Sequence, residues 1–241
     1  MKTINIIVPV YNEAKRLPDT LASYQSFVSS RREYDYKLVL VNDGSSDDSL
    51  AIIKSFATMN SLVQILNLEV NQGKGNALKQ GILASGQADY YYLADADLSA
   101  GWETLDQLLT AQGTANAVIG SRAVVTSKVA TVWYRKLLGR LSALLIQLVL
   151  GLGIKDTQCG YKLFDNSLFK LINLVQETRW SFDFELLYIY KLAGLTVKEY
   201  GIKWQNMPGS KVKFFDYFKQ LPALVKIRLR HNVHKVQSVL A

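Results

Sequence analysis

The sequence is poor in cysteine, histidine and proline, and each shortage excludes a class of protein. The single cysteine, Cys159, excludes an internal disulfide framework and a cysteine-only zinc cluster. The two histidines, His231 and His234, lie near the C-terminus and argue against a catalytic triad or a multi-histidine metal site. Four prolines in 241 residues, with 49% hydrophobic residues, exclude a disordered chain. We therefore expect a globular protein in a reducing compartment.

A long hydrophobic run is also missing. The most apolar stretch, from Leu141 to Leu152, is interrupted by Ser142, Gln147 and Gly151, and it is shorter than the roughly 20 residues that a spanning helix needs. The first ten residues predict a strand and lack the apolar region and cleavage site of a secretory signal. These features predict a cytosolic protein without a transmembrane helix.

Acidic residues are scarce in two parts of the chain. Residues 203–241 contain eight lysines and arginines but only one acid, Asp216, and residues 122–155 contain no acid at all. Both stretches repeat apolar residues at helical spacing, as a core helix or a membrane-surface helix would. Basic and amphipathic together, they favour an anionic membrane surface over a solvated basic face and over nucleic acid, which we do not expect as a partner. The apolar repeats are Leu137, Leu138, Leu141, Leu144, Leu145 and Leu148, and then Phe214, Phe215, Phe218, Leu221, Leu224 and Val225.

The first 120 residues alternate between apolar runs and helix-like stretches. Such alternation predicts an α/β fold, a Rossmann-like doubly wound and mostly parallel sheet with helices on both faces. The expected strands are Ile4–Val10, Lys37–Val41, Val63–Leu66, Tyr90–Ala94 and Ala117–Ile119, and the expected helices lie near 13–29, 46–59, 74–85 and 102–111.

The second half is less regular and carries no linker that would mark a new domain. It predicts amphipathic helices near 133–150, 165–173, 182–193 and 214–236, with a strand near 196–202. We interpret it as an elaboration of the same sheet. The expected unit is a single domain over 1–241, with a nucleotide-sugar half at 1–122 and an acceptor and membrane-surface half at 123–241.

Polar residues follow the predicted strands, where ligands bind in open α/β sheets. Asp95 and Asp97 follow one strand, and two such close carboxylates predict a site for Mg²⁺ or Mn²⁺, although solvated turns carry the same pattern. Asp43 follows another strand and suits the imide N–H of a uracil ring, or else caps a helix. Lys74 lies in a glycine-flanked turn that would cradle phosphate. The turn is not a P-loop, and no dinucleotide fingerprint is present.

Taken together, the ordered motifs resemble those of the inverting family 2 glycosyltransferases of GT-A fold. The first-half motifs are Val8-Pro9-Val10-Tyr11-Asn12-Glu13, Asn42-Asp43-Gly44-Ser45, Gly73-Lys74-Gly75, Asp95-Ala96-Asp97 and Gly120-Ser121-Arg122. The second half is similar to the dolichyl-phosphate β-glucosyltransferase branch. Its motifs are Asp156-Thr157-Gln158-Cys159-Gly160-Tyr161-Lys162-Leu163-Phe164, Arg179-Trp180-Ser181-Phe182-Asp183-Phe184-Glu185-Leu186-Leu187 and Gly209-Ser210-Lys211-Val212.

The sequence departs from the family pattern at two places. Asn42 stands where an aspartate is common, and the N-terminal membrane anchor of the eukaryotic enzymes has no counterpart. We therefore expect peripheral attachment to the cytoplasmic face of the membrane, or a membrane partner protein that supplies the contact.

The resemblance implies a role for each matched residue. The uridine of a UDP-sugar would be held by Pro9, Tyr11, Glu13 and Asp43, the ribose or diphosphate by Lys74 and Asp95, and the metal by Asp95 and Asp97. Gln158 and Gly160 would line the sugar pocket, and Asp156 and Asp183 would lie near the reacting centre. Arg122, Trp180, Ser210 and Lys211 would contact the acceptor, although Trp180 suits the core equally well.

The resemblance implies transfer of a hexose, with glucose as the expected sugar, from a UDP-sugar to a polyprenyl phosphate such as undecaprenyl or dolichyl phosphate, with inversion. A lipid phosphate is already anionic and needs no strong base, whereas a sugar hydroxyl would need Asp156 or Asp183 as its base. The alternatives are a glycosyltransferase acting on such a hydroxyl, a nucleotidyltransferase, and an inactive membrane-surface binding module of the same fold.

Overall fold

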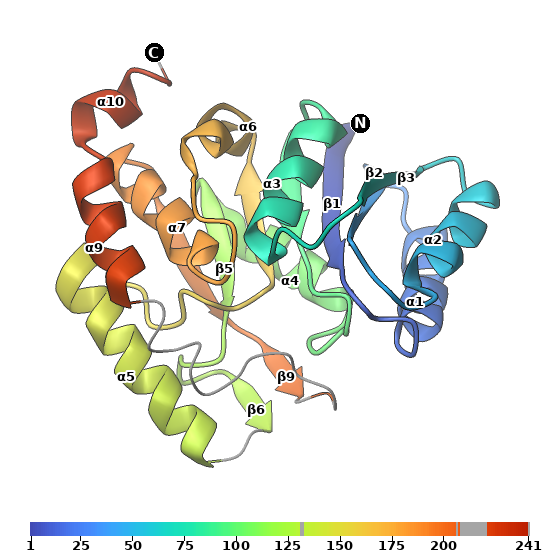
Figure 1. Cartoon of the computed structure of the whole chain (residues 1–241), viewed down its shortest axis with the longest axis horizontal. Coiled ribbons are helices and arrows are strands. Elements are labelled where there is room, and N and C mark those ends of the chain that lie inside the picture. The colour runs from blue at the N-terminus through green and yellow to red at the C-terminus, as the bar shows by residue number, and fades with distance from the viewer. Residues whose placement is uncertain (131–132, 206, 208–220, 241) are drawn as a thin grey trace.

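The protein folds around a seven-stranded sheet, as a computed structural model that describes residues 1–130, 133–205, 207 and 221–240 shows (Figure 1). The strand order is β3-β2-β1-β4-β7-β5-β8, and β7 alone runs against its neighbours β4 and β5. The strands are β1 (Lys2–Val10), β2 (Tyr34–Asp43), β3 (Val63–Leu68), β4 (Tyr90–Leu93), β5 (Ala117–Ser121), β7 (Lys162–Asp165) and β8 (Val197–Gly201).

Helices cover both faces of the sheet because the strands are apolar on both sides. Along β1, Ile4, Ile6 and Val8 contribute to one core, and Ile7 points into the other. The first core includes α1 (Leu17–Ser29), α2 (Ser49–Thr58) and α4 (Glu103–Gln112). The second includes α3 (Lys74–Ser85), α6 (Ser167–Leu171), the 3₁₀ helix Ile172–Leu174, α7 (Phe182–Leu192) and α10 (Val233–Gln237).

The strand order reverses direction between β1 and β4. From β1 the chain builds outward through β2 and β3 on one side, and it then returns to place β4 on the other side. Loops after neighbouring strands diverge at such a switch point and leave a crevice at the carboxyl edge. The residues that follow β1 and β4 therefore border the expected ligand site.

Two further pairs of elements, each joining segments far apart in the sequence, complete the fold beside the seven-stranded sheet. Helix α5 (Trp133–Leu150) packs against α9 (Leu221–Arg230), with Ile146, Leu150, Leu224 and Ile227 in a third core. A two-stranded sheet joins β6 (Lys128–Ala130) to β9 (Lys203–Gln205). Of the helices in the described residues, none has both the length and the apolar character that crossing a membrane requires.

The predicted doubly wound fold is confirmed, with three differences in the second half. The strands β6, β7 and β9 were not predicted, because each begins with a lysine and has no run of more than two apolar residues. The expected helix at 165–173 is a five-residue α-helix followed by a 3₁₀ turn. The expected helix at 214–236 is interrupted at residues 231–232, and its first part, 214–220, lies outside the described residues.

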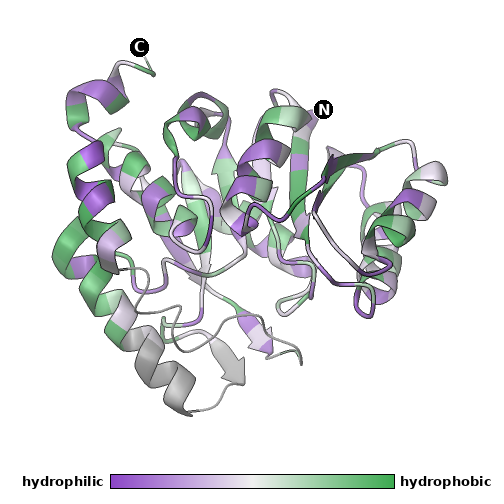
Figure 2. Ribbon diagram, in the orientation of Figure 1, coloured by the Kyte–Doolittle hydropathy of each residue, from purple (hydrophilic) through white to green (hydrophobic). Residues whose placement is uncertain are grey.

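One face of the α5–α9 pair is apolar and exposed. We call it the outer α5–α9 face. In Figure 2 hydrophobic residues dominate the coloured part of α5, and hydrophobic and hydrophilic residues alternate along α9. Leu144 is 55% exposed and Leu148 is 73% exposed, so this part of the leucine repeat does not face the core. The face consists of Leu141, Leu144, Leu145, Leu148, Val225 and Leu229.

Candidate active site

The end of β2 shapes the turn that leads into α3. The buried carboxylate of Asp43 accepts hydrogen bonds from the backbone N–H of Gln72 at 2.8 Å and of Gly73 at 2.9 Å, and from Asn71 Nδ2 at 3.0 Å. Asp43 therefore fixes the path of residues 71–73. The helix-cap interpretation of Asp43 is wrong, because α2 begins at Ser49 and Asp48 is its N-cap residue.

The turn approaches a second segment, residues 178–182, more closely than a side chain allows. Gly73 has a φ of +101°, and a Cβ there would lie 2.6 Å from the carbonyl oxygen of Thr178. The same carbonyl accepts a hydrogen bond from the N–H of Asn76 at 2.9 Å. The amino end of α3 is thus held between Asp43 and the loop before α7, and the positive end of the helix dipole there favours an anion.

Lys74 and Asp95 form an ion pair at the centre of the site. Lys74 Nζ lies 2.5 Å from Asp95 Oδ1. Burial disfavours the charged form of both side chains, but the attraction between the two opposite charges outweighs it. The pKa of Asp95 is therefore lowered, and the pKa of Lys74 is raised. Gly160 makes room for the pair, because a Cβ there would lie 2.0 Å from Asp95 Oδ2.

Asp97 lies two residues further along the same loop and stays partly exposed. Its Oδ1 accepts hydrogen bonds from Ser99 N at 3.1 Å and Ser99 Oγ at 2.7 Å, and its Oδ2 lies 3.9 Å from Arg16. The loop also holds Leu98 at a φ of +51°. A non-glycine residue in this conformation is strained, which is common at functional sites.

The donor set of this loop fits a divalent cation that also binds phosphate. The carboxylate of Asp97 is partly exposed and lies two residues after Asp95 of the Lys74–Asp95 pair. Mg²⁺ and Mn²⁺ bind through one or two carboxylates and complete their shell with substrate phosphates and water. Within the described residues no group of three or more His, Cys, Asp or Glu side chains could hold a metal alone. The loop therefore suits a metal that arrives with its substrate.

A second ion pair lies after β5. Asp156 Oδ2 accepts hydrogen bonds from the backbone N and from Nε of Arg122, both at 2.8 Å, and Oδ1 accepts from Nη2 at 2.9 Å. Burial opposes ionisation of Asp156, but the guanidinium outweighs it and lowers the pKa of this carboxyl. The guanidinium carbon also lies 5.5 Å from the centre of the Trp204 ring.

A third ion pair is fully enclosed. Lys162, on β7, places Nζ 2.5 Å from Asp183 Oδ1 in the first turn of α7, and it also donates to the carbonyl of Cys159. The side chain of Lys162 is 1% exposed, and that of Asp183 is 6% exposed. Both candidate base carboxylates, Asp156 and Asp183, are therefore paired with cations.

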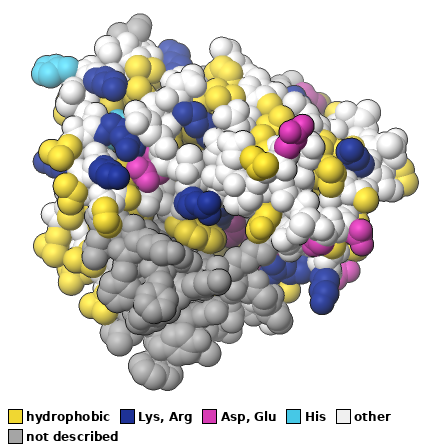
Figure 3. All heavy atoms as spheres, viewed as in Figure 1, with side chains coloured by type: hydrophobic (Ala, Val, Ile, Leu, Met, Phe, Trp, Pro, Cys, Tyr) yellow, Lys and Arg dark blue, Asp and Glu magenta, His cyan; other side chains and the backbone are white. Residues whose placement is uncertain are grey.

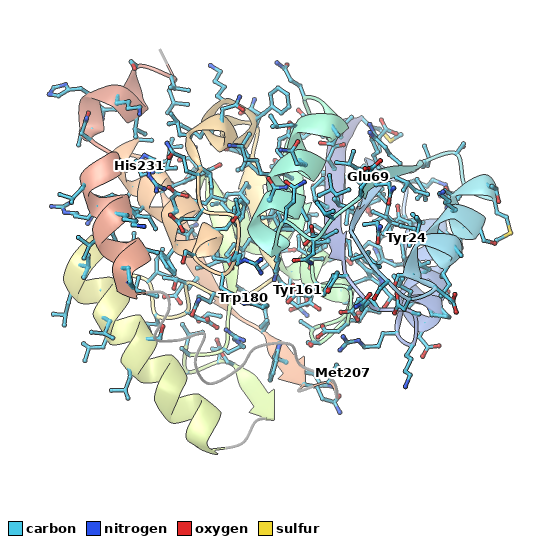
Figure 4. The ribbon with its side chains drawn as sticks, viewed as in Figure 1. Tyr24, Glu69, Tyr161, Trp180, Met207 and His231 are labelled. Carbon is cyan, nitrogen blue, oxygen red and sulfur yellow. The ribbon has the colours of Figure 1, made fainter. Side chains whose placement is uncertain are left out.

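The remaining predicted residues border this region. Pro9 lies at the end of β1 and Tyr11 just beyond it, where Glu13 bonds Ser49 through its N–H and Arg16 through its carboxylate. Trp180 is only partly buried, and its ring centre lies 5.8 Å from Lys74 Nζ, so the core interpretation of this residue is wrong. Figure 4 shows Trp180 near the middle of the view. Gln158 lies in the loop that leads to Gly160, and Ser210 and Lys211 lie outside the described residues.

Sequence reasoning missed the partners of these groups. Lys162 directly precedes the apolar residues Leu163 and Phe164, and a lysine next to core residues was itself a signal that a buried carboxylate must face it. Arg16 is the N-cap residue of α1, and neither it nor Glu199, which contacts the backbone of Asp156, belongs to a quoted motif. Such pairs join residues tens of positions apart, and only the fold brings them together.

Comparisons with known proteins agree with this architecture. A family model described as glycosyl transferase family 2 matches residues 5–172. A dolichyl-phosphate beta-glucosyltransferase (ALG5A) of Trichomonas vaginalis is 35% identical over 95% of this chain and 74% of the relative. The human dolichyl-phosphate beta-glucosyltransferase is 30% identical over 95% of this chain and 76% of the relative.

Solved structures of similar fold are more distant in sequence. The glucosyl-3-phosphoglycerate synthase of Mycobacterium tuberculosis in complex with Mn²⁺, UDP and glucosyl-3-phosphoglycerate superposes with a TM-score of 0.67. The match is 17% identical and covers 94% of this chain and 80% of that one. A structure of the same synthase with Mg²⁺ and UDP also gives a TM-score of 0.67 at 17% identity, covering 94% and 79% of the two chains. The shared fold is that of GT-A glycosyltransferases.

Proposed function

This chain belongs to glycosyl transferase family 2, and from that membership we propose that it transfers glucose from UDP-glucose to a polyprenyl phosphate. The bond between the anomeric carbon and the β-phosphate oxygen of UDP breaks, UDP departs, and the carbon bonds to a phosphate oxygen of the lipid. Attack from the opposite face inverts the configuration and gives a β-linked polyprenyl glucosyl phosphate. The relatives named as dolichyl-phosphate beta-glucosyltransferases support the acceptor class and the sugar.

The pairing of both candidate bases carries this proposal. A sugar hydroxyl must lose its proton as it attacks, and Asp156 and Asp183 are the two carboxylates matched to that task. Asp156 is bound bidentately by Arg122, which lowers its pKa and makes it a weaker base, and Asp183 is enclosed with Lys162. A phosphate acceptor carries its negative charge before it arrives, so it needs neither carboxylate as a base.

The first half of the chain, 1–122, would hold the donor. Pro9, Tyr11, Glu13 and Asp43 surround the position proposed for uridine, and the amino end of α3 with Lys74 faces the diphosphate. Lys74 then exchanges part of its interaction with Asp95 for the incoming phosphates. Gln158 and Gly160 come from the second half and border the sugar.

Asp97, with Asp95 beside it, would hold the divalent metal, Mg²⁺ or Mn²⁺. When bound, such an ion neutralises the charge that develops on the UDP leaving group. The metal complexes of the mycobacterial synthase support this assignment at the level of the fold. Both carboxylates are held in place by the protein itself, because Ser99 donates a hydrogen bond to Asp97 and Lys74 pairs with Asp95.

The second half, 123–241, would bring the acceptor and the membrane surface to the site. Arg122 at the boundary attracts the lipid phosphate, and Trp180 borders it. Ser210 and Lys211 belong to the last of the matched motifs, to which we assign acceptor contact. The outer α5–α9 face supplies apolar contact, with the exposed cations Lys226 and Arg228 beside it. We place the protein on the cytoplasmic face of the membrane, by this surface or through a membrane partner protein.

Incubation of the purified chain with labelled UDP-glucose and undecaprenyl phosphate in detergent micelles tests the proposal. With Mg²⁺ or Mn²⁺ we expect label in the organic phase, in a product that mild acid hydrolyses to glucose. A chelator should abolish the transfer. Asp97→Asn should lower the rate by about 100-fold, because the variant keeps the side-chain size and loses the charge that holds the cation.

Asp89→Asn provides the matched control, since Asp89 lies at the other end of β4 and bonds only Thr3 among the contacts described for it. It should leave the rate unchanged. Labelled UDP-glucose that binds but transfers only to a sugar hydroxyl would contradict the lipid-phosphate acceptor. Binding without transfer to either class of acceptor would point to a binding module.

A further inference from the structure

Glu199, in the middle of β8, accepts three hydrogen bonds next to the Arg122–Asp156 pair. Its Oε1 accepts from Ser121 Oγ at 2.8 Å and from the N–H of Asp156 at 3.0 Å, and its Oε2 accepts from the N–H of Lys155 at 2.8 Å. The β5–β8 pairing fixes the strand that carries it, with Glu199 in register with Ile119. One carboxylate thus ties a strand end to the loop that follows Gly151.

These three donors flank the Arg122–Asp156 pair. Ser121 directly precedes Arg122, and Lys155 directly precedes Asp156. Residues 151–158 contain no helix or strand of their own, so the backbone N–H of the buried Asp156 depends on a side-chain acceptor. The geometry of the guanidinium, which Asp156 binds through two carboxylate oxygens, depends in turn on where this loop lies.

We propose that Glu199 is a positioning residue for phosphate-acceptor transfer, acting by fixing the backbone of Asp156 and the end of β5 so that Arg122 faces the acceptor. This inference rests on the proposed function, since it assigns the Arg122–Asp156 pair to the acceptor. Glu199 itself does not touch the reacting atoms in this assignment. Its contribution is the orientation of a guanidinium, for which small displacements cost large factors in rate.

Glu199→Gln is a sharp probe because all three partners of the carboxylate are able to donate and two of them are backbone N–H groups. A carboxylate accepts on both oxygens, whereas an amide must turn its NH₂ group toward one of the donors. The variant keeps the size of the side chain and removes one acceptor. Ser121→Ala is the milder companion, because it deletes a single donor and leaves both backbone bonds in place.

Asp165→Asn is the matched control. Asp165 also ties two segments together, accepting from Ser167 and from Asn116 Nδ2, but it does so at the opposite edge of the sheet. Its loss should lower the melting temperature without changing the kinetics toward the acceptor.

We expect Glu199→Gln to raise the KM for undecaprenyl phosphate and lower kcat, by about tenfold in kcat/KM or more. The Kd for UDP with Mg²⁺ should stay within about twofold, because the donor turn at 71–76 is held by Asp43 and Thr178. Ser121→Ala should change the acceptor parameters in the same direction by a smaller factor. If Glu199 only stabilised the fold, its substitution would instead lower the melting temperature and leave the KM for the acceptor unchanged in the folded variants.

Hydrogen exchange decides the inference independently of turnover. In Glu199→Gln, peptides that cover 151–158 and 120–123 should exchange faster, while the peptide that covers 71–76 keeps its wild-type rate. Unchanged exchange in 151–158, or unchanged acceptor kinetics in both variants, would overturn the inference. Failure of the wild-type chain to glucosylate a lipid phosphate would overturn the proposed function, and the exchange result would still show whether Glu199 holds the pair in place.

Discussion

Gly160 shows how finely the site is fitted at the scale of single residues. The carboxylate of Asp95 occupies the space that a Cβ at residue 160 would need. Gly160→Ala should therefore push Asp95 away from Lys74 and lower kcat/KM for the donor by about 10- to 100-fold. Steady-state kinetics with varied UDP-glucose measure this effect.

Gly139→Ala is the control for that substitution. Gly139 is an exposed glycine inside α5, with open space where a Cβ would lie. Alanine there should stabilise the helix by about 0.5–1 kcal/mol and leave the kinetics unchanged. Equal activity of the two variants would show that the contact between residue 160 and Asp95 does not matter for the donor.

Individual residues were predictable where their position along a strand determines their role. Asp43, Asp95, Asp97 and Arg122 each follow an apolar run, and the fold brings them to one edge as expected. Their partners were not predictable, because hydrophobic periodicity does not report contacts between residues far apart in sequence. Arg122 and Asp156 are 34 positions apart, and the pairing of Asp156 with the arginine expected to contact the acceptor was not predicted.

At the scale of elements, a buried glutamate links α7 to the end of α9. The enclosed Glu185 accepts hydrogen bonds from the N–H groups of Gln176 and Glu177 and from Arg230, and it lies 2.8 Å from His231 Nε2. Figure 4 shows His231 where α9 lies against α7. The cluster explains why the helix predicted over 214–236 ends at Arg230, since the chain turns there to place His231 in the core.

The Glu185 cluster predicts a pH-dependent stability. Burial opposes the charge of Glu185, but His231, the two backbone N–H groups and Arg230 lower its pKa below the usual value. Because the folded-state pKa is depressed, the stabilisation is complete above the unfolded pKa of about 4.3 and is lost as the pH falls through the folded value. Glu185→Gln should cost about 3 kcal/mol at pH 7, and the gap to wild type should narrow below about pH 4.

Urea unfolding of wild type and variant between pH 3 and pH 7, with the lower limit chosen about one unit below the pKa of a free glutamate, measures that gap. Glu177→Gln is the control, because Glu177 shares Arg230 but is partly exposed. Its effect should be small at every pH. A gap for Glu185→Gln that stays constant from pH 7 to pH 3 would contradict the role of its charge.

Strand β7 explains why the elements of the first half were easier to predict than those of the second. The five strands of the first half, β1 to β5, run parallel and repeat one apolar pattern, and all five were predicted. Strand β7 is four residues long, runs in the opposite direction and has the charged Lys162 at its start. Its place between β4 and β5 depends on tertiary pairing, for which a single short run carries no signal.

At the scale of the whole molecule, charge and apolar surface meet on one side. Figure 3 shows hydrophobic side chains along the border formed by α5 and α9, with lysines and arginines over α9. The overall excess of positive charge, +8, was evident from the sequence, as was the helical spacing of the leucines. That these leucines face outward could not be predicted, because core and interface helices share the same periodicity.

Vesicle binding tests the outer α5–α9 face. Replacing Leu144 and Leu148 together by serine should weaken sedimentation with vesicles that contain an anionic phospholipid by about tenfold or more, since each leucine loses an apolar contact worth about 1 to 2 kcal/mol. Added salt should weaken binding of the wild type, because Lys226 and Arg228 contribute through their charge.

The double replacement of Met59 and Leu62 by serine is the control. Both residues are exposed and apolar, but they follow α2 and are not part of the α5–α9 pair. Vesicle binding should be unchanged in this variant. Equal losses in the two double variants would mean that apolar surface in general, and not this face, drives the association.

The position of β7 has a consequence for how this protein can change over time. The two halves proposed above, 1–122 and 123–241, are interlocked in space, because β7 of the second half separates β4 from β5 of the first. A gene fragment ending after residue 122 would encode β5 without the neighbour that attaches it to the sheet. A new acceptor half therefore cannot be acquired by simple exchange at that boundary unless it brings its own copy of the intervening strand. Changes in acceptor preference should instead arise within loops such as 151–158, while the seven-stranded sheet stays intact.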